Sequence, residues 1–273
     1  MITLTIAGSD SGGGAGIQAD IKTFQELGVF GTSVITALTA QNTLGVHDIF
    51  PTTVQFVEAQ LKAVLEDFNV KAIKTGMLFN SEIIECVATI LKTSDLPLIV
   101  DPVMIAKGGA SLLQQDAIQA LKTKLLPIAT VCTPNIPEAE VISGRSIKTE
   151  QDLFLAAQDI LSIGVQCVVM KGGHLASDKA IDVVFIKGEV PFVLETNRFE
   201  TKHTHGTGCT FSAAVTAEIA KGKSLQQAIL EAKKFVQLAI SNPLNIGHGF
   251  GPTNHFAYRQ FEGKCDVDVV ESR

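Results

Sequence analysis

A regular alternation of short β-branched runs with longer amphipathic segments limits the folds open to this sequence. Strand-like runs occur at residues 2–7, 33–40, 71–76, 96–101, 129–134, 166–171 and 180–186. Between the earlier runs, apolar residues recur with helical spacing at 17–27, 54–68, 81–92 and 115–126. Strands that alternate with helices predict an α/β fold, a three-layer α/β/α sandwich around a mainly parallel sheet.

The last part of the chain departs from this alternation. Two strand-like runs flank Lys187-Gly188-Glu189, which predicts a hairpin and therefore a small antiparallel edge on the sheet. Two helices are expected at about 208–220 and 225–240. No linker, repeat or low-complexity tract divides the sequence, so we expect one domain over residues 1–258 and a solvated C-terminal tail over 259–273.

Composition limits the class of partner. The chain has 273 residues, of which 46% are hydrophobic, and can bury a full core. Its formal net charge is -6 and it has no Lys/Arg run, so we do not expect a nucleic-acid partner. Its first residues do not resemble a signal peptide, and no apolar run approaches the ~20 residues of a membrane span. We therefore expect a cytoplasmic protein with no membrane partner and a small-molecule ligand.

Ligands of parallel sheets bind at the carboxyl ends of the strands. The first strand is followed by AGSDSGGGAGIQAD (7–20), in which glycines such as Gly8 let the backbone approach a ligand closely. This stretch fits neither a P-loop nor a dinucleotide-binding turn. Asp10 and Asp20 flank the glycines, which favours a substrate loop over a merely flexible turn.

Other candidate residues follow the next strands. Gln41 offers a carboxamide that can read an uncharged ring through both a donor and an acceptor. Met77 is either an apolar wall of the site or an ordinary core residue. Asp101 ends the fourth strand, where a carboxylate serves an ion or caps a loop.

The stretch TPNIPEAE (133–140) suggests a metal site after the fifth strand. A helix that begins at Pro137 would direct Asn135 and Glu138 to one spot, which suits a hydrated Mg²⁺. The alternative is that both residues only cap the helix. Lys171 follows the sixth strand and is expected near a triphosphate.

The stretch THGTGCTFSAA (204–214) places Cys209 after a glycine turn and before a helix. The backbone N–H groups of Gly206, Thr207, Gly208 and Cys209 would lack helical partners and form an anion site. A metal role is disfavoured because only His205 lies near with ligand spacing. A thiolate nucleophile stays open, since a helix N-terminus lowers the pKa of a thiol.

Taken together, these stretches resemble the ribokinase-like superfamily of small-molecule kinases. GTGC before a helix is similar to its Gly-x-Gly-Asp anion hole and base, and NIPE to its Asn-x-x-Glu magnesium motif, with Cys209 in the place of the base Asp. One branch shares that cysteine. AGSDSGGGAGIQADIKTFQ, TAQNTLGV, KTGML, VDPVMIAKGG, MKGGH and GHGFGPTNHF resemble the hydroxymethylpyrimidine/phosphomethylpyrimidine kinases of thiamine biosynthesis, from residue 3 to about residue 256.

The resemblance implies an activity and a set of roles. ATP would phosphorylate 4-amino-5-hydroxymethyl-2-methylpyrimidine and then its monophosphate, in a protein that is a homodimer. The resemblance places Gln41, Asp20, Ala15 and Gly8 at the pyrimidine ring, with Met77 and Val103 as apolar walls of the ring site. It places Lys171, Thr207 and Asn135 at ATP, and Asp101 and Glu138 at Mg²⁺. The backbone N–H groups of residues 206–209 would bind the transferred phosphoryl group, with Cys209 as the base.

Two other functions remain open at this point. A pyridoxal kinase of the same branch would share the cysteine and the glycine loop, although QNTLG (41–45) favours the pyrimidine kinases. A non-catalytic pyrimidine or nucleotide sensor could use the same fold, because a fold alone does not establish a reaction. The presence of Asn135, Glu138, Lys171 and the whole anion site argues against the sensor.

Overall fold

The computed structural model describes residues 1–104, 115–172, 179–261 and 263–271. The end of VDPVMIAKGG, from residue 105, and the last two residues of MKGGH lie outside the described residues. No helix in the described ranges is long and apolar enough to cross a membrane.

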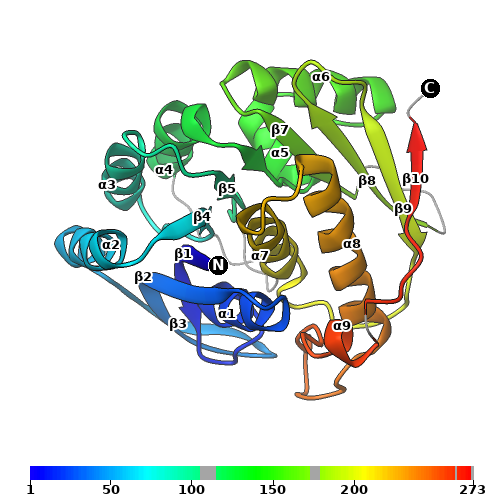
Figure 1. Cartoon of the computed structure of the whole chain (residues 1–273), viewed down its shortest axis with the longest axis horizontal. Coiled ribbons are helices and arrows are strands. Elements are labelled where there is room, and N and C mark those ends of the chain that lie inside the picture. Colours follow the sequence, from blue (N-terminus) through cyan, green and yellow to red (C-terminus); the bar gives the residue numbers. More distant parts are fainter. Residues whose placement is uncertain (105–114, 173–178, 262, 272–273) are drawn as a thin grey trace.

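One sheet forms the centre of the molecule (Figure 1). Its strands are β1 (Ile2–Asp10), β2 (Phe30–Asn42), β3 (Gly45–Pro51), β4 (Val70–Thr75), β5 (Leu98–Val100), β6 (Val131–Cys132), β7 (Cys167–Lys171), β8 (Lys179–Ile186), β9 (Phe192–Asn197) and β10 (Asp268–Glu271). Their spatial order is β10-β9-β8-β7-β6-β5-β4-β1-β2-β3. The strands from β2 to β7 in this order pair in parallel, and β3, β8, β9 and β10 add antiparallel pairs at the two edges.

Helices cover both faces of this sheet, which confirms the predicted sandwich. They are α1 (Gly16–Glu26), α2 (Val54–Asp67), α3 (Ser81–Leu91), α4 (Gln115–Ala120), α5 (Ile136–Ser143), α6 (Glu150–Ser162), α7 (Thr207–Ala220), α8 (Leu225–Ser241) and α9 (Ala257–Gln260). Helices α2 to α6 pack on one face around residues such as Leu61, Ile83 and Ile160, and α1, α7 and α8 pack on the other around Phe24 and Phe235 (Figure 1).

Local sequence signals fix where several helices begin and end. Asn135, Thr149 and Ser224 precede α5, α6 and α8, and each accepts a hydrogen bond from the backbone three residues on, in a capping box. Helix α5 therefore begins at Ile136, one residue before the predicted start at Pro137. It ends at Gly144, whose φ of 75° is the left-handed conformation that suits glycine.

Helix α7 is the central helix of its layer. It contacts α1 and α8 as well as β1, β4 and β5. Its residues from Thr210 to Ala217 are all buried, which requires small or apolar side chains all round the helix rather than on one stripe. This burial holds the N-terminus of α7 in a fixed position at the carboxyl ends of the strands.

Some elements differ from the sequence predictions. Strand β2 runs on through Asn42 and turns into β3, so the predicted small antiparallel edge has a counterpart at the opposite side of the sheet. The helix expected over 115–126 is regular only to Ala120 and then forms a π-helical turn at Leu121–Leu125 and a 3₁₀ turn at Leu126–Ile128. Pro127 contributes to this change because it has no N–H for a helical hydrogen bond.

The C-terminal tail is exposed at residues 268–270, as a solvated tail would be, but it also contains a strand that the sequence did not predict. Residues Asp268–Glu271 form β10, which pairs antiparallel with β9. The physical reason is that β9 would otherwise leave its backbone groups unpaired at the sheet edge, and the backbone of the DVVE stretch at 268–271 satisfies them.

Candidate active site

A cavity of about 340 Å³ opens at the carboxyl ends of β1, β2, β4 and β5, next to the N-terminus of α7. It is where a parallel sheet is expected to bind its ligand. The structure brings nearly all predicted site residues together in its wall: Gly8, Ala15, Gln41, Met77, Asp101, Val103, Asn135, Glu138, Lys171, Gly206, Thr207, Gly208 and Cys209. The remaining predicted site residue, Asp20, does not line the cavity.

Asp20 lies beneath the cavity in a buried ion pair. Its Oδ2 atom accepts hydrogen bonds from Lys74 Nζ at 2.8 Å and from Thr5 Oγ1 at 2.6 Å. Both members of the Lys74–Asp20 pair are fully buried. Burial favours a neutral Lys74 amine, but the attraction of Asp20 outweighs this effect and raises the pKa of Lys74. Sequence reasoning missed Lys74, although a lysine inside a buried strand run, KAIKT, is an available signal.

The start of α7 is open to an anion. Gly206 is its N-cap with a φ of 81°, and no side chain among the described residues caps the helix. A Cβ atom on Gly206 would lie 1.7 Å from the Gly14 carbonyl oxygen, so only glycine lets the two turns meet. A Cβ on Gly208 would lie 3.2 Å from Lys171 Nζ, which places a cation beside the same turn. This combination suits phosphate groups.

Cys209 is half-buried in the first turn of α7. Shielding from water raises the pKa of its thiol to about 11, while the nearby Lys74 ammonium and the Gly16 N–H favour the thiolate. The influence of the helix N-terminus expected from sequence is therefore outweighed by burial in the free protein. The thiol is protonated in nearly all molecules at neutral pH, and only the small thiolate fraction can act as a base.

Two carboxylates, Asp101 and Glu138, also line the cavity, and Asp101 lies beside the start of α7, where it accepts a hydrogen bond from Ser212 Oγ. Asp101 is buried and lies 3.2 Å from Lys171 Nζ through Oδ1. Glu138 accepts a hydrogen bond from the Asn135 N–H, and Asn135 accepts one from the Glu138 N–H, so the capping alternative holds for both residues. Burial raises the pKa of Glu138 to about 7; Lys171 lowers this pKa and the charge of Asp101 raises it further.

A divalent cation would relieve this repulsion. In the described part of the chain, no group of three or more His, Cys, Asp or Glu side chains could hold a metal ion alone. Two carboxylates beside a phosphate site nevertheless fit Mg²⁺, which keeps several waters and takes few protein ligands.

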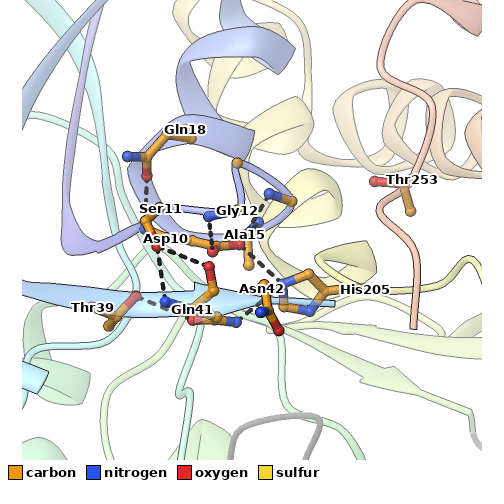
Figure 2. A network of polar contacts seen from close by, with 12 residues as sticks. Asp10, Ser11, Gly12, Ala15, Gln18, Thr39, Gln41, Asn42, His205 and Thr253 are labelled. Atoms are coloured by element: carbon orange, nitrogen blue, oxygen red, sulfur yellow. Dashed lines mark hydrogen bonds and ion pairs between the residues drawn. The ribbon is translucent and has the colours of Figure 1, made fainter. Parts of the chain in front are cut away.

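A polar network occupies the end of the cavity near β2 (Figure 2). Asp10 accepts hydrogen bonds from the backbone N–H groups of Gly12, Gly14 and Ala15 at 2.8 to 2.9 Å. Burial opposes ionisation of Asp10, but hydrogen bonds from His205 and Ala15 lower its pKa. Asp10 thus holds the glycine turn in place as a carboxylate.

His205 joins this turn to Gln41. Its Nε2 atom lies 2.9 Å from Asp10 Oδ2 and 3.1 Å from Gln41 Nε2. Sequence reasoning gave Asp10 no partner and considered His205 only as a metal ligand. The signal that was present is an aspartate directly before a glycine-rich turn, whose free N–H groups need an acceptor.

Comparison with known proteins gives a consistent result. The profile of the family described as phosphomethylpyrimidine kinase matches residues 10–254. A hydroxymethylpyrimidine/phosphomethylpyrimidine kinase of Haemophilus influenzae is 58% identical over 261 residues, which cover 93% of this chain and 96% of that protein. One of Bacillus subtilis is 53% identical over 258 residues, covering 94% and 95%.

The fold is also close to that of a solved enzyme. The pyridoxal kinase of Staphylococcus aureus in complex with AMP-PCP and pyridoxal superposes with a TM-score of 0.90 at 39% sequence identity, and the match covers 99% of each chain. The architecture is therefore that of the ribokinase-like kinases. At 39% identity, the similarity extends beyond the fold to the amino-acid sequence.

Proposed function

Since the chain belongs to the phosphomethylpyrimidine kinase family, we propose a role in that family's reaction for each side of the cavity. The protein is a small-molecule kinase of thiamine biosynthesis that uses ATP to phosphorylate 4-amino-5-hydroxymethyl-2-methylpyrimidine and then its monophosphate. The observation that carries the assignment of roles is that the uncapped start of α7 and the carboxamide of Gln41 face the same cavity.

The phosphate side lies at the start of α7. We assign the ATP phosphates to the N–H groups of residues 206–209, to Thr207 and to the Lys171 ammonium, with Asn135 at the edge of the ATP site. Phosphoryl transfer mainly needs positioning and stabilisation of charge on the equatorial oxygens, which fixed N–H dipoles and an ammonium supply.

The ring side lies at the ends of β1 and β2. Gln41 would read the polar edge of the aminopyrimidine, and the backbone at Gly8 and Ala15 would border the ring. Met77 and Val103 would form apolar walls. A Cβ atom on Gly8 would lie 2.3 Å from Met77 Cε, so the glycine makes the room that Met77 occupies. Asp20, which the resemblance places near the ring, would act only from beneath through Lys74.

Cys209 lies where the two sides meet, and we assign it the role of general base. In the small fraction of the enzyme whose Cys209 has lost its proton to solvent, the substrate hydroxyl would attack the terminal phosphorus of ATP, the bond from that phosphorus to the bridging oxygen of ADP would break, and the hydroxyl proton would pass to the thiolate. Because the pKa of the thiol is about 11, this transfer is late and follows the loss of electron density from the attacking oxygen.

Asp101 and Glu138 would hold Mg²⁺, directly or through its water shell. The bound cation would supply charge neutralisation for the phosphates. Lys171 and Asp101 both lie beside Gly208 at the start of α7, so the Lys171 ammonium would offset the charge of Asp101 next to the phosphates.

We also propose that residues 1–258 form the single catalytic domain and that two copies associate. Leu38 on β2 and Phe50 on β3 are cross-strand partners, and both are exposed, as is Leu44 in the connecting turn. We name the cross-strand pair Leu38 and Phe50 the β2–β3 patch. An apolar patch on an edge hairpin supports association with a second copy.

A pyridoxal kinase activity is the second candidate, favoured by the likeness to the Staphylococcus aureus enzyme.

To test which substrate is used, the purified protein is incubated with Mg-ATP and either the hydroxymethylpyrimidine or pyridoxal, and the products are separated by chromatography. We expect the pyrimidine monophosphate and then the pyrophosphate, with much slower conversion of pyridoxal. Ligand-dependent thermal stabilisation without any ADP release would instead support a sensor.

A further inference from the structure

The carboxamide of Gln41 has two ends that differ in chemistry but not in shape. Which end faces which neighbour follows from the hydrogen bonds around it. The Gln41 backbone is fixed first: its N–H donates to Ser11 Oγ at 2.8 Å, and Ser11 Oγ donates to its carbonyl oxygen at 2.8 Å (Figure 2). The side chain therefore starts from a fixed point at the end of β2.

His205 is held just as firmly. Its backbone N–H donates to the Gly251 carbonyl at 3.0 Å, and its own carbonyl accepts from the Thr253 N–H at 3.1 Å. A Cβ atom on Gly14 would lie 2.6 Å from the His205 ring, so the glycine turn closes over the imidazole. These contacts leave the ring little freedom to turn away from Asp10.

The proton on His205 Nε2 has a clear acceptor. This nitrogen lies 2.9 Å from a carboxylate oxygen of Asp10, and a nitrogen lone pair in that position would repel the carboxylate. His205 Nε2 therefore carries a proton and is a donor. Gln41 Nε2 lies 3.1 Å from the same atom and is also a donor, so the two nitrogen atoms face each other without an acceptor. The contact becomes favourable when the Gln41 carboxamide is flipped, so that its oxygen and nitrogen exchange places.

The rotated carboxamide satisfies every neighbour. Its oxygen then shares the one Nε2–H proton of His205 with Asp10 Oδ2, as the more distant acceptor of a three-centre hydrogen bond. Its nitrogen takes the position 3.3 Å from Thr39 Oγ1, whose own proton goes to the Ser9 carbonyl at 2.8 Å and whose lone pairs are free to accept. One lone pair on the oxygen and one proton on the nitrogen remain for a ligand in the cavity.

From this geometry we propose that His205, supported by Asp10, is a specificity-determining positioning residue. It fixes the Gln41 carboxamide with its acceptor on the His205 side and its donor on the Thr39 side. An aminopyrimidine matches this order, because its exocyclic amino group is a donor beside a ring nitrogen that is an acceptor. Pyridoxal has an aldehyde oxygen, an acceptor, next to its hydroxymethyl group, where the pyrimidine has the amino donor, so its groups do not match this order. The inference rests on the proposed contact of Gln41 with the ring.

A double-mutant cycle tests this inference. We expect His205→Leu to raise the KM for the hydroxymethylpyrimidine about tenfold, to lower the preference for it over pyridoxal by a similar factor, and to leave the KM for ATP within about twofold. In a Gln41→Ala background, His205→Leu should have no further effect on either substrate. His205→Gln, which can still donate an N–H, should restore part of the preference.

Three controls keep the outcomes separate. His47→Leu makes the same change at an exposed position on β3 outside the cavity wall and should leave both KM values unchanged. Thr39→Val removes the partner on the other side of Gln41, so it should lower the preference for the pyrimidine even if His205→Leu does not fold. Thermal unfolding identifies a folding defect.

Multiplicative effects of His205→Leu and Gln41→Ala would overturn the inference, because they would show that His205 acts independently of Gln41. Wild-type protein that converts no pyrimidine would instead overturn the proposed function. The two failures are therefore distinguishable in one set of assays.

Discussion

At the scale of single residues, Cys209 shows how one position can serve two needs. The first turn of α7 must bring its N–H groups close to phosphates, so it tolerates only small side chains near Gly206 and Gly208. A thiol is small, and although burial and the charges of Asp101 and Asp20 raise its pKa, Lys74 and the Gly16 N–H limit that rise. The residue thus combines a steric role in the anion site with that of proton acceptor.

We predict that Cys209→Ala lowers kcat by about 10²- to 10⁴-fold, the usual contribution of a general base. The KM for ATP should hold, because the backbone N–H groups of residues 206–209 remain. Cys209→Asp should recover part of the loss. Steady-state kinetics with the pyrimidine at saturating Mg-ATP measures these effects.

The pH profile separates a base from a merely small residue. With a thiol pKa of about 11, wild-type kcat should rise with pH in the alkaline range, above the pKa of about 7 of Glu138, because each step toward the thiol pKa increases the thiolate fraction. Cys209→Asp should lack this rise, since its carboxylate is already ionised. A Cys209→Ala enzyme with wild-type kcat would leave the chemistry to the anion site alone.

We predict that Gln41→Ala weakens pyrimidine binding by about 1 to 3 kcal/mol, because the polar edge of the buried ring would lose its partners. Isothermal titration with the pyrimidine in the presence of a non-hydrolysable ATP analogue measures this change. Unchanged affinity would remove Gln41 from the ring site.

At the scale of elements, the Lys74–Asp20 pair ties α1 to β4 below the cavity. Because both side chains are fully buried, removal of one partner leaves an uncompensated charge. We predict that Lys74→Met lowers the free energy of unfolding by about 3 to 5 kcal/mol. Urea unfolding followed by circular dichroism measures this loss.

The matched control is the double variant Lys74→Met with Asp20→Asn, in which no charge is buried. It should recover a large part of the lost stability. Equal instability of the single and double variants would mean that Lys74 contributes through packing rather than through its charge.

The elements also show how far sequence reasoning reaches. The parallel strands and most helices were predictable because each carries a periodic apolar pattern of its own, and the residues at strand ends followed from the sheet. Strand β3 was missed because TLGV after β2 looks like a loop, and it forms only because β2 continues beside it. Asp20 was expected at the ring but lies beneath the cavity, for a related reason. Its position shortly after the glycine loop does not reveal that its side chain on α1 points toward Lys74.

At the scale of the whole molecule, one buried histidine couples stability to pH. His255 lies 3.0 Å from Thr210 Oγ1 and is nearly inaccessible to solvent. Burial lowers its pKa to about 4 from the ordinary value of 6.5, and the charge of Lys22 acts in the same direction. The unfolded chain therefore binds this proton more readily than the folded one, so His255 destabilises the fold as pH falls below 6.5 toward 4.

We predict that His255→Gln, which can keep a hydrogen bond to Thr210, reduces the loss of stability between pH 7.5 and pH 5 by about 2 kcal/mol. Urea unfolding at both pH values measures it. His47→Gln, at an exposed position, should leave the pH dependence as in the wild type. An unchanged pH dependence in His255→Gln would place the acid sensitivity elsewhere.

Association of two copies is a property of the same scale. We predict that Phe50→Asp in the β2–β3 patch converts a dimer to monomers, because the charge cannot be buried against a second copy. Phe50 is 71% exposed in the single chain, so the substitution should not disturb the fold. Sedimentation velocity at several concentrations tests this, with Val190→Asp, at another exposed apolar residue, as the control.

The pairing of β10 with β9 has a consequence for the tendency of the purified protein to aggregate. Strand β9 is long enough to template another chain, and β10 covers the backbone of Phe192–Glu195. The strand that then forms the sheet edge is only four residues long and begins and ends with an acidic residue. Short, charged edges resist cross-chain strand addition. Strand β10 thus protects the sheet against fibril-like assembly. Its removal would expose the unpaired backbone of β9 to strand addition from other molecules, far from the catalytic cavity.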